Sequence, residues 1–316
     1  MKFYLAPMEG ITGYIYRNAY HDFFHPMDKY FTPFIVPKNL RKLKNKEIRD
    51  ILPENNTAAP IIPQILTNNA QDFIHMARGL GDMGYTEVNL NLGCPSGTVV
   101  AKGKGAGFLA EPVALDRFLY EIFSELDMKI SVKTRLGMDD PGEFEDLLAI
   151  YNRYAMEELI IHPRVRQDMY KNTPHMQVFE MAMAESRNKV IYNGDIFTVA
   201  AYAQLTEQFV DLEGVMLGRG IIGNPGLLDA IAGDSVLTKA RLRAFHDRLL
   251  ADYAQIMYGE RNLLFRMKEL WAYMGGLFPD GEKFVKQIRK SARLADYEAA
   301  VNGMFAQCAL HVDGNV

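Results

Sequence analysis

Eight short apolar segments, rich in β-branched residues, constrain the fold of this chain more than any other feature of its sequence. They cover residues 3–7, 30–35, 61–66, 86–91, 130–135, 158–162, 190–193 and 214–217. Segments with helical periodicity lie between most of them, for example residues 70–83 and 113–126. Strand and helix that alternate eight times predict an α/β protein of the (β/α)8 or TIM-barrel class, which closes near Gly218.

The C-terminal part of the chain has a different pattern. Residues 238–258, 260–274 and 283–300 show helical periodicity without strands between them. We therefore predict two domains: a catalytic barrel over residues 1–233 and a small helical domain over residues 234–316.

The composition narrows the class of protein. The chain has 316 residues, of which 48% are hydrophobic, and this is ample for a core. The only cysteines, Cys94 and Cys308, cannot build a disulfide framework or a thiolate metal cluster. No signal peptide or apolar run of membrane-spanning length is visible. We expect a cytoplasmic, monomeric protein that requires neither a membrane nor a metal.

A cysteine stands at the carboxyl end of the fourth predicted strand. The sequence from Asn89 to Ser96 reads Asn-Leu-Asn-Leu-Gly-Cys-Pro-Ser, and a loop rich in glycine and lysine follows at residues 102–107. Parallel barrels place their chemistry at this end of the strands, and Pro95 stiffens the backbone after Cys94. Most free cysteines are only small buried hydrophobes. The position of Cys94 favours a chemical role.

Other polar side chains fall at or near the ends of successive predicted strands, where they would face one another across the barrel mouth. They are Gln64, Asn91, Lys133, His162 and Asn193. An ammonium group in an apolar strand is costly unless it is paired, so Lys133 is either a salt-bridged rim residue or the partner of an anionic cofactor atom. His162 is either a structural histidine or a functional one.

Two glycine-containing loops follow the last two predicted strands. One is Asn193-Gly194-Asp195, and the other covers residues 217–225 with Gly218 and Arg219. Glycines let backbone amides approach a phosphate, and arginine binds phosphate through two hydrogen bonds. Either loop alone is compatible with a plain turn. The two together favour a phosphate site, which barrels often place after strands seven and eight.

Basic residues are concentrated in two runs, although the net charge is −4. The first consists of Lys38, Arg41, Lys42, Lys44, Lys46 and Arg49, and the second of Lys283, Lys286, Arg289, Lys290 and Arg293. Such runs are usually solvated faces. In an acidic chain, two concentrated runs also suggest a track for a polyanion.

Taken together, these motifs resemble those of the tRNA-dihydrouridine synthase family. The matching segments are residues 5–12, 89–96, 132–137, 161–162, 193–195, 214–220, 223–225 and 265–273, with Gln64 and the basic run after Gly281. The resemblance implies an FMN enzyme that reduces the C5–C6 double bond of particular uridines in tRNA. It also implies NADPH, or NADH, as the co-substrate that supplies the electrons.

The resemblance further implies a role for each matching residue. The FMN-binding residues would be Pro7, Met8, Gln64, Lys133, His162, Asn193, Gly194, Asp195, Gly218 and Arg219. Asn91 would contact the target uracil, and Lys286, Arg289 and Lys290 would contact the tRNA. Cys94 would deliver the proton to C5, because a thiol of ordinary pKa, about 8.5, is mostly protonated at neutral pH.

Two other interpretations remain open. A reductase of a free pyrimidine, similar to dihydroorotate dehydrogenase, would also be an FMN barrel, but a small substrate needs no basic helical tail. A non-catalytic RNA-binding barrel would purify without the yellow colour of a bound flavin.

Overall fold

The computed structural model describes residues 1–37 and 45–312. Contacts between Cα atoms divide the chain into two compact units. The first unit comprises Met1–Pro7, Asp28–Gly194 and Phe209–Met216, and the second comprises Met8–Met27, Asp195–Gln208 and the chain from Leu217 onward. The predicted domain boundary at residue 234 is a proposal that these units do not test.

The strands form one parallel sheet in the order β3-β2-β1-β9-β8-β7-β6-β5-β4. They are β1 (Lys2–Leu5), β2 (Lys29–Phe31), β3 (Ile61–Ile62), β4 (Gln64–Ile65), β5 (Glu87–Leu92), β6 (Lys129–Arg135), β7 (Leu159–His162), β8 (Val190–Tyr192) and β9 (Gly214–Leu217). Seven of the eight neighbouring pairs in this order are successive strands of the chain, and the eighth joins β1 to β9, as the sequence pattern predicted for a TIM barrel.

One predicted strand, residues 61–66, is interrupted, and the interruption lies where the sheet closes. Pro63 has no N–H group to donate, so it separates β3 from β4. The Ile62 carbonyl accepts from Thr32 N at 3.0 Å on one side, and the Pro63 carbonyl accepts from Asn89 N at 2.9 Å on the other. The N–H of Gln64 donates to the Thr32 hydroxyl at 3.1 Å. The short segment around Pro63 therefore joins both edges of the sheet.

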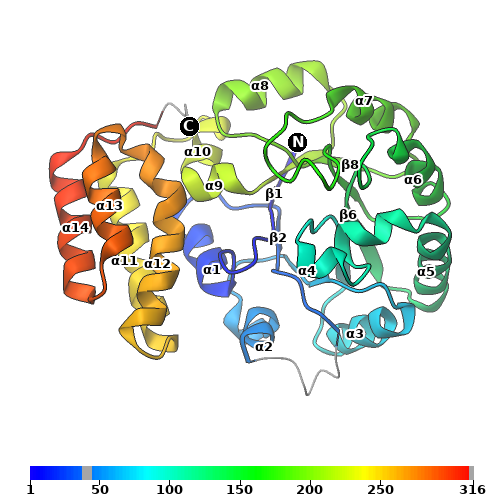
Figure 1. Ribbon diagram of the computed structural model, residues 1–316, viewed down its shortest axis with the longest axis horizontal. Coiled ribbons are helices and arrows are strands. Elements are labelled where there is room, and N and C mark those ends of the chain that lie inside the picture. The colour runs from blue at the N-terminus through cyan, green and yellow to red at the C-terminus, as the bar shows by residue number, and fades with distance from the viewer. Residues whose placement is uncertain (38–44, 313–316) are drawn as a thin grey trace. The chain divides into compact units, whose positions relative to one another are not determined.

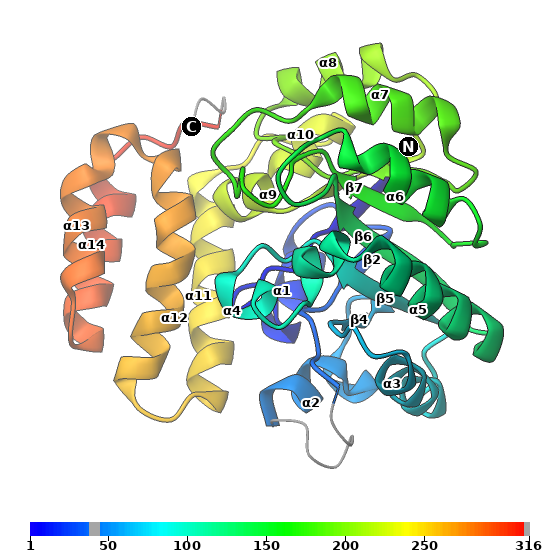
Figure 2. The ribbon, with the colours of Figure 1, turned by 45° about the vertical axis from the view of Figure 1, so that its right-hand side comes forward.

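Five helices of the first unit cover the outer side of its strands (Figures 1 and 2). They are α2 (Asn45–Ile51), α3 (Ala70–Asp82), α5 (Pro112–Glu125), α6 (Glu143–Tyr151) and α7 (Met176–Glu185), whereas the short α4 (Gly97–Val100) belongs to the loop that follows β5. The helices predicted at residues 70–83 and 113–126 are confirmed within one residue at each end. The Asn69 side chain caps α3 by accepting from Asp72 N at 2.8 Å, and Pro112 occupies the first turn of α5.

Apolar side chains fill the middle of the first unit, and an ionic group closes the amino end of its strands. The apolar cluster contains Tyr4, Ala6, Phe31, Ile62, Ile160, Ile191 and Met216. Lys29 Nζ lies 2.7 Å from a carboxylate oxygen of Glu87 and 3.0 Å from one of Glu158, both of which are buried. Burial raises the pKa of Glu87 even though Lys29 is bound to it.

The second unit is helical. Its helices are α1 (Tyr14–Phe23), α8 (Val199–Gln208), α9 (Arg219–Gly223), α10 (Leu227–Ala232), α11 (Lys239–Ile256), α12 (Glu260–Met274), α13 (Glu282–Lys290) and α14 (Leu294–Gln307). Helices α11 to α14 lie side by side (Figure 1). Trp271 is fully buried among them, and its indole N–H donates to the Tyr297 hydroxyl at 2.9 Å. That hydroxyl also bonds His246 Nε2 at 2.6 Å, so the aromatic core is linked by polar contacts.

The prediction of unbroken helical periodicity over residues 283–300 is wrong, because the chain leaves the helix at Ser291. The Ser291 hydroxyl donates to the Ile288 carbonyl at 2.7 Å, and its own backbone is extended. The Ser291 carbonyl accepts from the Lys268 side chain of α12. It is therefore not available to accept a hydrogen bond from a further turn of helix. Serine often competes in this way with helical hydrogen bonds.

Two further features concern the part of the chain that the structure describes. None of its helices has the length and apolar character needed to cross a membrane. Nor do its residues include a group of three or more histidine, cysteine, aspartate or glutamate side chains that could hold a metal ion.

Replacing Lys29 by methionine should destabilise the protein by about 3–5 kcal/mol near neutral pH, because it leaves the buried Glu87 without its counter-charge and Glu158 with only the partly exposed Lys2. Burial already raises the folded-state pKa of Glu87, and loss of Lys29 would raise it further above the unfolded value. The folded protein would take up protons as the pH falls, so the deficit should shrink toward pH 5. Urea unfolding midpoints at pH 5 and 7.5 measure this. Lys129→Met, which removes an exposed pair with Glu157, is the control and should change stability little. A deficit that does not vary with pH would contradict the argument.

Candidate active site at the carboxyl ends of the strands

The register of β5 and β6 places the predicted polar residues on the inner face of the sheet. Asn91 pairs with Lys133, and Arg135 pairs with His162 of β7. Side chains alternate along a strand. The Thr134 hydroxyl lies 3.0 Å from the Tyr151 hydroxyl of α6, so Thr134 faces the outer helices. Lys133 and Arg135 therefore project to the opposite, inner side.

A chain of buried amide groups links three neighbouring strands. Asn91 Nδ2 donates to Gln64 Oε1 at 2.7 Å, and Gln64 Nε2 donates to Asn89 Oδ1 at 2.8 Å. Asn89 Nδ2 in turn donates to the Ser131 hydroxyl at 3.0 Å. These bonds fix which way each amide points. Each amide nitrogen carries two hydrogens, so Gln64 and Asn91 each keep one N–H for a ligand.

The loop that carries Cys94 is held by the same network. Asn91 Oδ1 accepts from Gly93 N at 3.0 Å and from Cys94 N at 2.9 Å. The Cys94 carbonyl accepts from Ala106 N at 3.1 Å. The thiol is half-buried and forms no disulfide. Its backbone is therefore fixed on both sides of Cα, at the end of the strand where the sequence predicted a chemical role.

Lys133 lies beside this loop with an unusual protonation equilibrium. Burial and, to a lesser extent, the positive charge of Arg135 together lower its pKa to about 7, whereas Cys94 acts in the opposite direction. Among the described residues its Nζ forms no ion pair, so the alternative of a salt-bridged rim residue finds no support there. A cation placed in this way favours an anionic neighbour.

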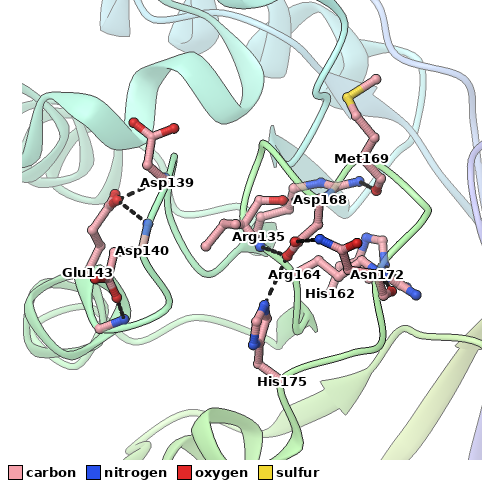
Figure 3. Close-up of polar contacts among 12 residues, drawn as sticks. Arg135, Asp139, Asp140, Glu143, His162, Arg164, Asp168, Met169, Asn172 and His175 are labelled. Carbon is pink, nitrogen blue, oxygen red and sulfur yellow. Dashed lines mark hydrogen bonds and ion pairs between the residues drawn. The ribbon is translucent and has the colours of Figure 1, made fainter.

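His162 and the loop that follows it form a second network (Figure 3). Arg164 Nη1 lies 3.0 Å from His162 Nε2. Because arginine only donates, Nε2 must be the unprotonated nitrogen, and the ring carries its hydrogen on Nδ1. The Tyr170 ring stacks near His162 at a centroid distance of 6.1 Å. The contact with Arg164 therefore fixes the orientation of the His162 ring at the end of β7.

Asp168 organises that loop. It accepts from Asn172 Nδ2 at 2.5 Å and from Val165 N at 3.0 Å, and it lies 3.0 Å from His175 Nε2 (Figure 3). Burial opposes the charged form, but these hydrogen bonds outweigh it and lower the pKa of Asp168. The carboxylate therefore stays ionised and holds residues 165–175 together.

Each of the two glycine-containing loops has a glycine whose backbone packs closely against other atoms of the protein. In the first unit, a Cβ on Gly194 would lie 2.0 Å from the Tyr192 hydroxyl. In the second, a Cβ on Gly220 would lie 2.1 Å from the Ile196 carbonyl oxygen. Both positions therefore exclude any side chain.

Polar contacts anchor the predicted phosphate-binding residues. Asn193 Nδ2 donates to the Met216 carbonyl at 2.8 Å, within the first unit. In the second unit, Arg219 forms an ion pair with Asp195, and both side chains remain partly exposed. Gly218 immediately precedes α9.

Pro7 and Met8 are half-buried, in the chain that connects β1 to α1. The Met8 amide donates to the Thr12 hydroxyl at 2.8 Å, and the Met8 carbonyl accepts from Ile11 N and Thr12 N. The backbone of Met8 is therefore used in its own turn, which leaves its side chain for packing against a ligand.

The predicted tRNA contacts Lys286, Arg289 and Lys290 meet at one groove of about 710 Å³ in the second unit. The other lining residues are Trp271, Ala272, Gly275, Gly276, Phe278, Glu282 and Val285. Of the other basic run, Lys46 and Arg49 belong to α2, and both are exposed. Lys38, Arg41, Lys42 and Lys44 lie outside the described residues.

Sequence reasoning assigned no role to two arginines of this region. Arg135 and Arg164 are each only 1% exposed, and both bond backbone carbonyl groups of loops that follow the strands. The position of each arginine, at or just after the end of an apolar strand, could have marked it as a candidate. The hydrogen-bond partners of both arginines, however, are backbone carbonyl groups, which a pattern of residue types does not reveal.

In the ligand-free protein, Lys133 should lose its proton near pH 7, because burial and the nearby Arg135 disfavour the ammonium form. After reductive ¹³C-methylation of the lysines, one NMR signal should titrate near neutral pH and be missing from Lys133→Met. The matched control Lys129→Met, which removes an exposed lysine of the same strand, should keep that signal. Titration of every lysine near the ordinary value of about 10.4 would contradict this assignment.

Two relatives align with most of this chain. A "Probable tRNA-dihydrouridine synthase" of Staphylococcus epidermidis is 31% identical over 230 residues, covering 71% of this chain and 69% of its own length. "Probable tRNA-dihydrouridine synthase 2" of Bacillus subtilis is 30% identical over 230 residues, covering 71% and 70%.

Solved structures support the barrel fold. A variant of NCR from Zymomonas mobilis superposes with a TM-score of 0.53 at 12% identity, over 77% of this chain and 90% of that one. Morphinone reductase in complex with tetrahydroNAD gives a TM-score of 0.52 at 10% identity, over 75% and 88%. The sequence profile described as "Dihydrouridine synthase (Dus)" matches residues 4–308. The chain therefore belongs to the dihydrouridine synthase family, as the resemblance of its motifs predicted.

Proposed function

We propose that this protein reduces the C5–C6 double bond of uridines in tRNA, with FMN as its bound flavin and NADPH as the electron donor. The observation that carries the proposal is the placement of Cys94 in a member of this family. Its backbone is fixed at the carboxyl end of β5, beside the unpaired cation Lys133.

The residues of each unit fit a flavin phosphate and ring. Lys133 is half-buried and forms no ion pair among the described residues, so its side chain suits the electron-rich pyrimidine edge of a flavin. The second N–H of the Gln64 amide would serve the same edge. Gly194 and Gly220 are required by packing against Tyr192 and Ile196, so the phosphate assignment rests on the guanidinium of Arg219 and on the family's motif. We assign the flavin to Pro7, Met8, Gln64, Lys133, His162, Asn193, Gly194, Asp195, Gly218 and Arg219.

The contacts refine two of these assignments. The Asp195 carboxylate has the same sign as a phosphate, so its side chain would orient Arg219, and Arg219 would bind the phosphate.

The reaction adds one hydride and one proton across the C5–C6 bond. A reduced flavin held by these residues would supply the hydride for C6. The Cys94 S–H bond breaks as a C–H bond forms at C5, and the resulting thiolate regains a proton from solvent. Asn91 holds the Cys94 amide through its oxygen and can donate its remaining N–H to a uracil carbonyl.

The groove on the second unit supports tRNA as the substrate. Three cations line one concave surface there, which a free pyrimidine would not need. A uridine must leave its stack to reach a barrel mouth, and the single-stranded loops of tRNA make this less costly.

Replacing Cys94 by alanine should slow single-turnover tRNA reduction by about 10²–10⁴-fold, the usual contribution of a general acid. Flavin content and reduction of the flavin by NADPH should be unchanged, because the thiol acts only on the substrate. Cys308→Ala, which removes the other cysteine, is the matched control and should be fully active. A protein that purifies without flavin and does not bind added FMN would contradict the proposed reaction. Normal turnover by Cys94→Ala would exclude the thiol as the acid.

Neutralising Lys286, Arg289 and Lys290 together to glutamine should weaken tRNA binding and flatten its salt dependence. The log–log slope should fall by roughly 0.7–0.9 for each phosphate contact removed. Titrations at several salt concentrations measure this. A triple variant at Arg78, Lys129 and Arg153 removes the same charge from exposed sites of the first unit and is the control. Equal slopes for the groove variant and the wild type would show that the groove is only a solvated face.

A further inference from the structure

Arg135 makes a set of contacts that the proposed reaction does not yet use. Its side chain is buried at the carboxyl end of β6 and donates to three backbone carbonyls. Nε bonds Gly93 O at 3.0 Å, Nη1 bonds Val165 O at 2.9 Å, and Nη2 bonds Met169 O at 2.7 Å. Its guanidinium also lies 5.3 Å from the ring centre of Tyr170.

The first of these contacts concerns the peptide group that carries the thiol. The Gly93 carbonyl and the Cys94 amide belong to the same planar peptide unit. Arg135 donates a hydrogen bond to the carbonyl oxygen of this peptide unit, and the N–H of the same unit donates to Asn91 Oδ1 at 2.9 Å. The next carbonyl along the chain, that of Cys94, is held by Ala106 N. Rotation of the backbone on the N-terminal side of Cys94 would therefore break a bond to a buried cation.

The other two contacts reach the loop that follows β7. Val165 and Met169 belong to the segment that Asp168 organises, and Met169 adopts a left-handed backbone with φ of 52°. An arginine presents five N–H groups in a rigid plane and can serve three carbonyls at once. One guanidinium thus ties the Cys94 loop to the loop that carries Tyr170 (Figure 3 shows its bond to Met169).

We propose that Arg135 is a positioning residue for Cys94: it clamps the Gly93–Cys94 peptide against residues 165–170 and so sets the direction of the thiol. The proposal rests on the function proposed above in so far as Cys94 acts as the acid. Lysine at this position has one ammonium centre and cannot span the three carbonyls, so it should not replace arginine.

The test compares Arg135→Lys with Arg164→Lys. Both arginines are buried and bond the same loop, but only Arg135 contacts the peptide of Cys94. In Arg135→Lys, flavin content and reduction by NADPH should match the wild type. Single-turnover tRNA reduction by the dithionite-reduced enzyme should fall by roughly 10²-fold, the usual cost of misplacing a reacting group by about 1 Å. Alkylation of Cys94 by iodoacetamide, measured in a Cys308→Ser background, should become several-fold faster as the loop loosens. In Arg164→Lys that alkylation rate should stay at the wild-type value.

A rescue experiment separates positioning from folding. In Arg135→Ala, added methylguanidinium should restore the slow alkylation and part of the tRNA reduction, whereas methylammonium should not. Unchanged alkylation in Arg135→Lys, or equal losses in flavin reduction and tRNA reduction, would overturn the proposal. If Cys94→Ala reduces tRNA normally, the thiol is not the acid, yet altered alkylation in Arg135→Lys alone would still support the clamp.

Discussion

The chain of hydrogen bonds from Asn91 through Gln64 to Asn89 is the contact on which the site depends. Gln64 follows Pro63, where the barrel closes and the strand hydrogen bonds are interrupted. At this point the Thr32 hydroxyl accepts from the Gln64 backbone N–H and so links β2 to β4. The same chain ends at Asn91, whose oxygen holds the Cys94 amide. Closure of the barrel and placement of the thiol are therefore parts of one network.

The two ends of the strands in the first unit have opposite electrostatic character. At the amino end, Glu87 and Glu158 are buried with one lysine, and at the carboxyl end the inner face carries Lys133 and Arg135. An apolar layer that includes Ile160, Ile191 and Met216 fills the space between strands. Apolar packing screens charges poorly, so the cations act on whatever enters the carboxyl end. That end is suited to anionic or electron-rich ligands.

Sequence patterns predicted the barrel, most strand positions and the residues at the strand ends, because periodicity and strand order depend on local sequence. They did not predict the interruption at Pro63 or the helix break at Ser291. Each depends on a distant partner, Thr32 for the Gln64 amide and Lys268 for the Ser291 carbonyl. The contacts of Arg135 were hidden for the same reason. Its partners are backbone carbonyl groups from two other loops. Every residue has such a group, so the residue types do not indicate which of them Arg135 contacts.

Lys133 and Arg135 lie two residues apart on the same face of β6, and they solve the problem of a buried cation differently. Arg135 stays charged because carbonyl oxygens surround its guanidinium. Lys133 has no such partners, so its pKa falls to about 7. An anion bound beside Lys133 would raise that pKa again, and binding above pH 7 would therefore take up a proton. Arg135, whose charge is permanent, therefore binds backbone carbonyl groups of the protein itself. Lys133, whose charge depends on pH, would bind the ligand.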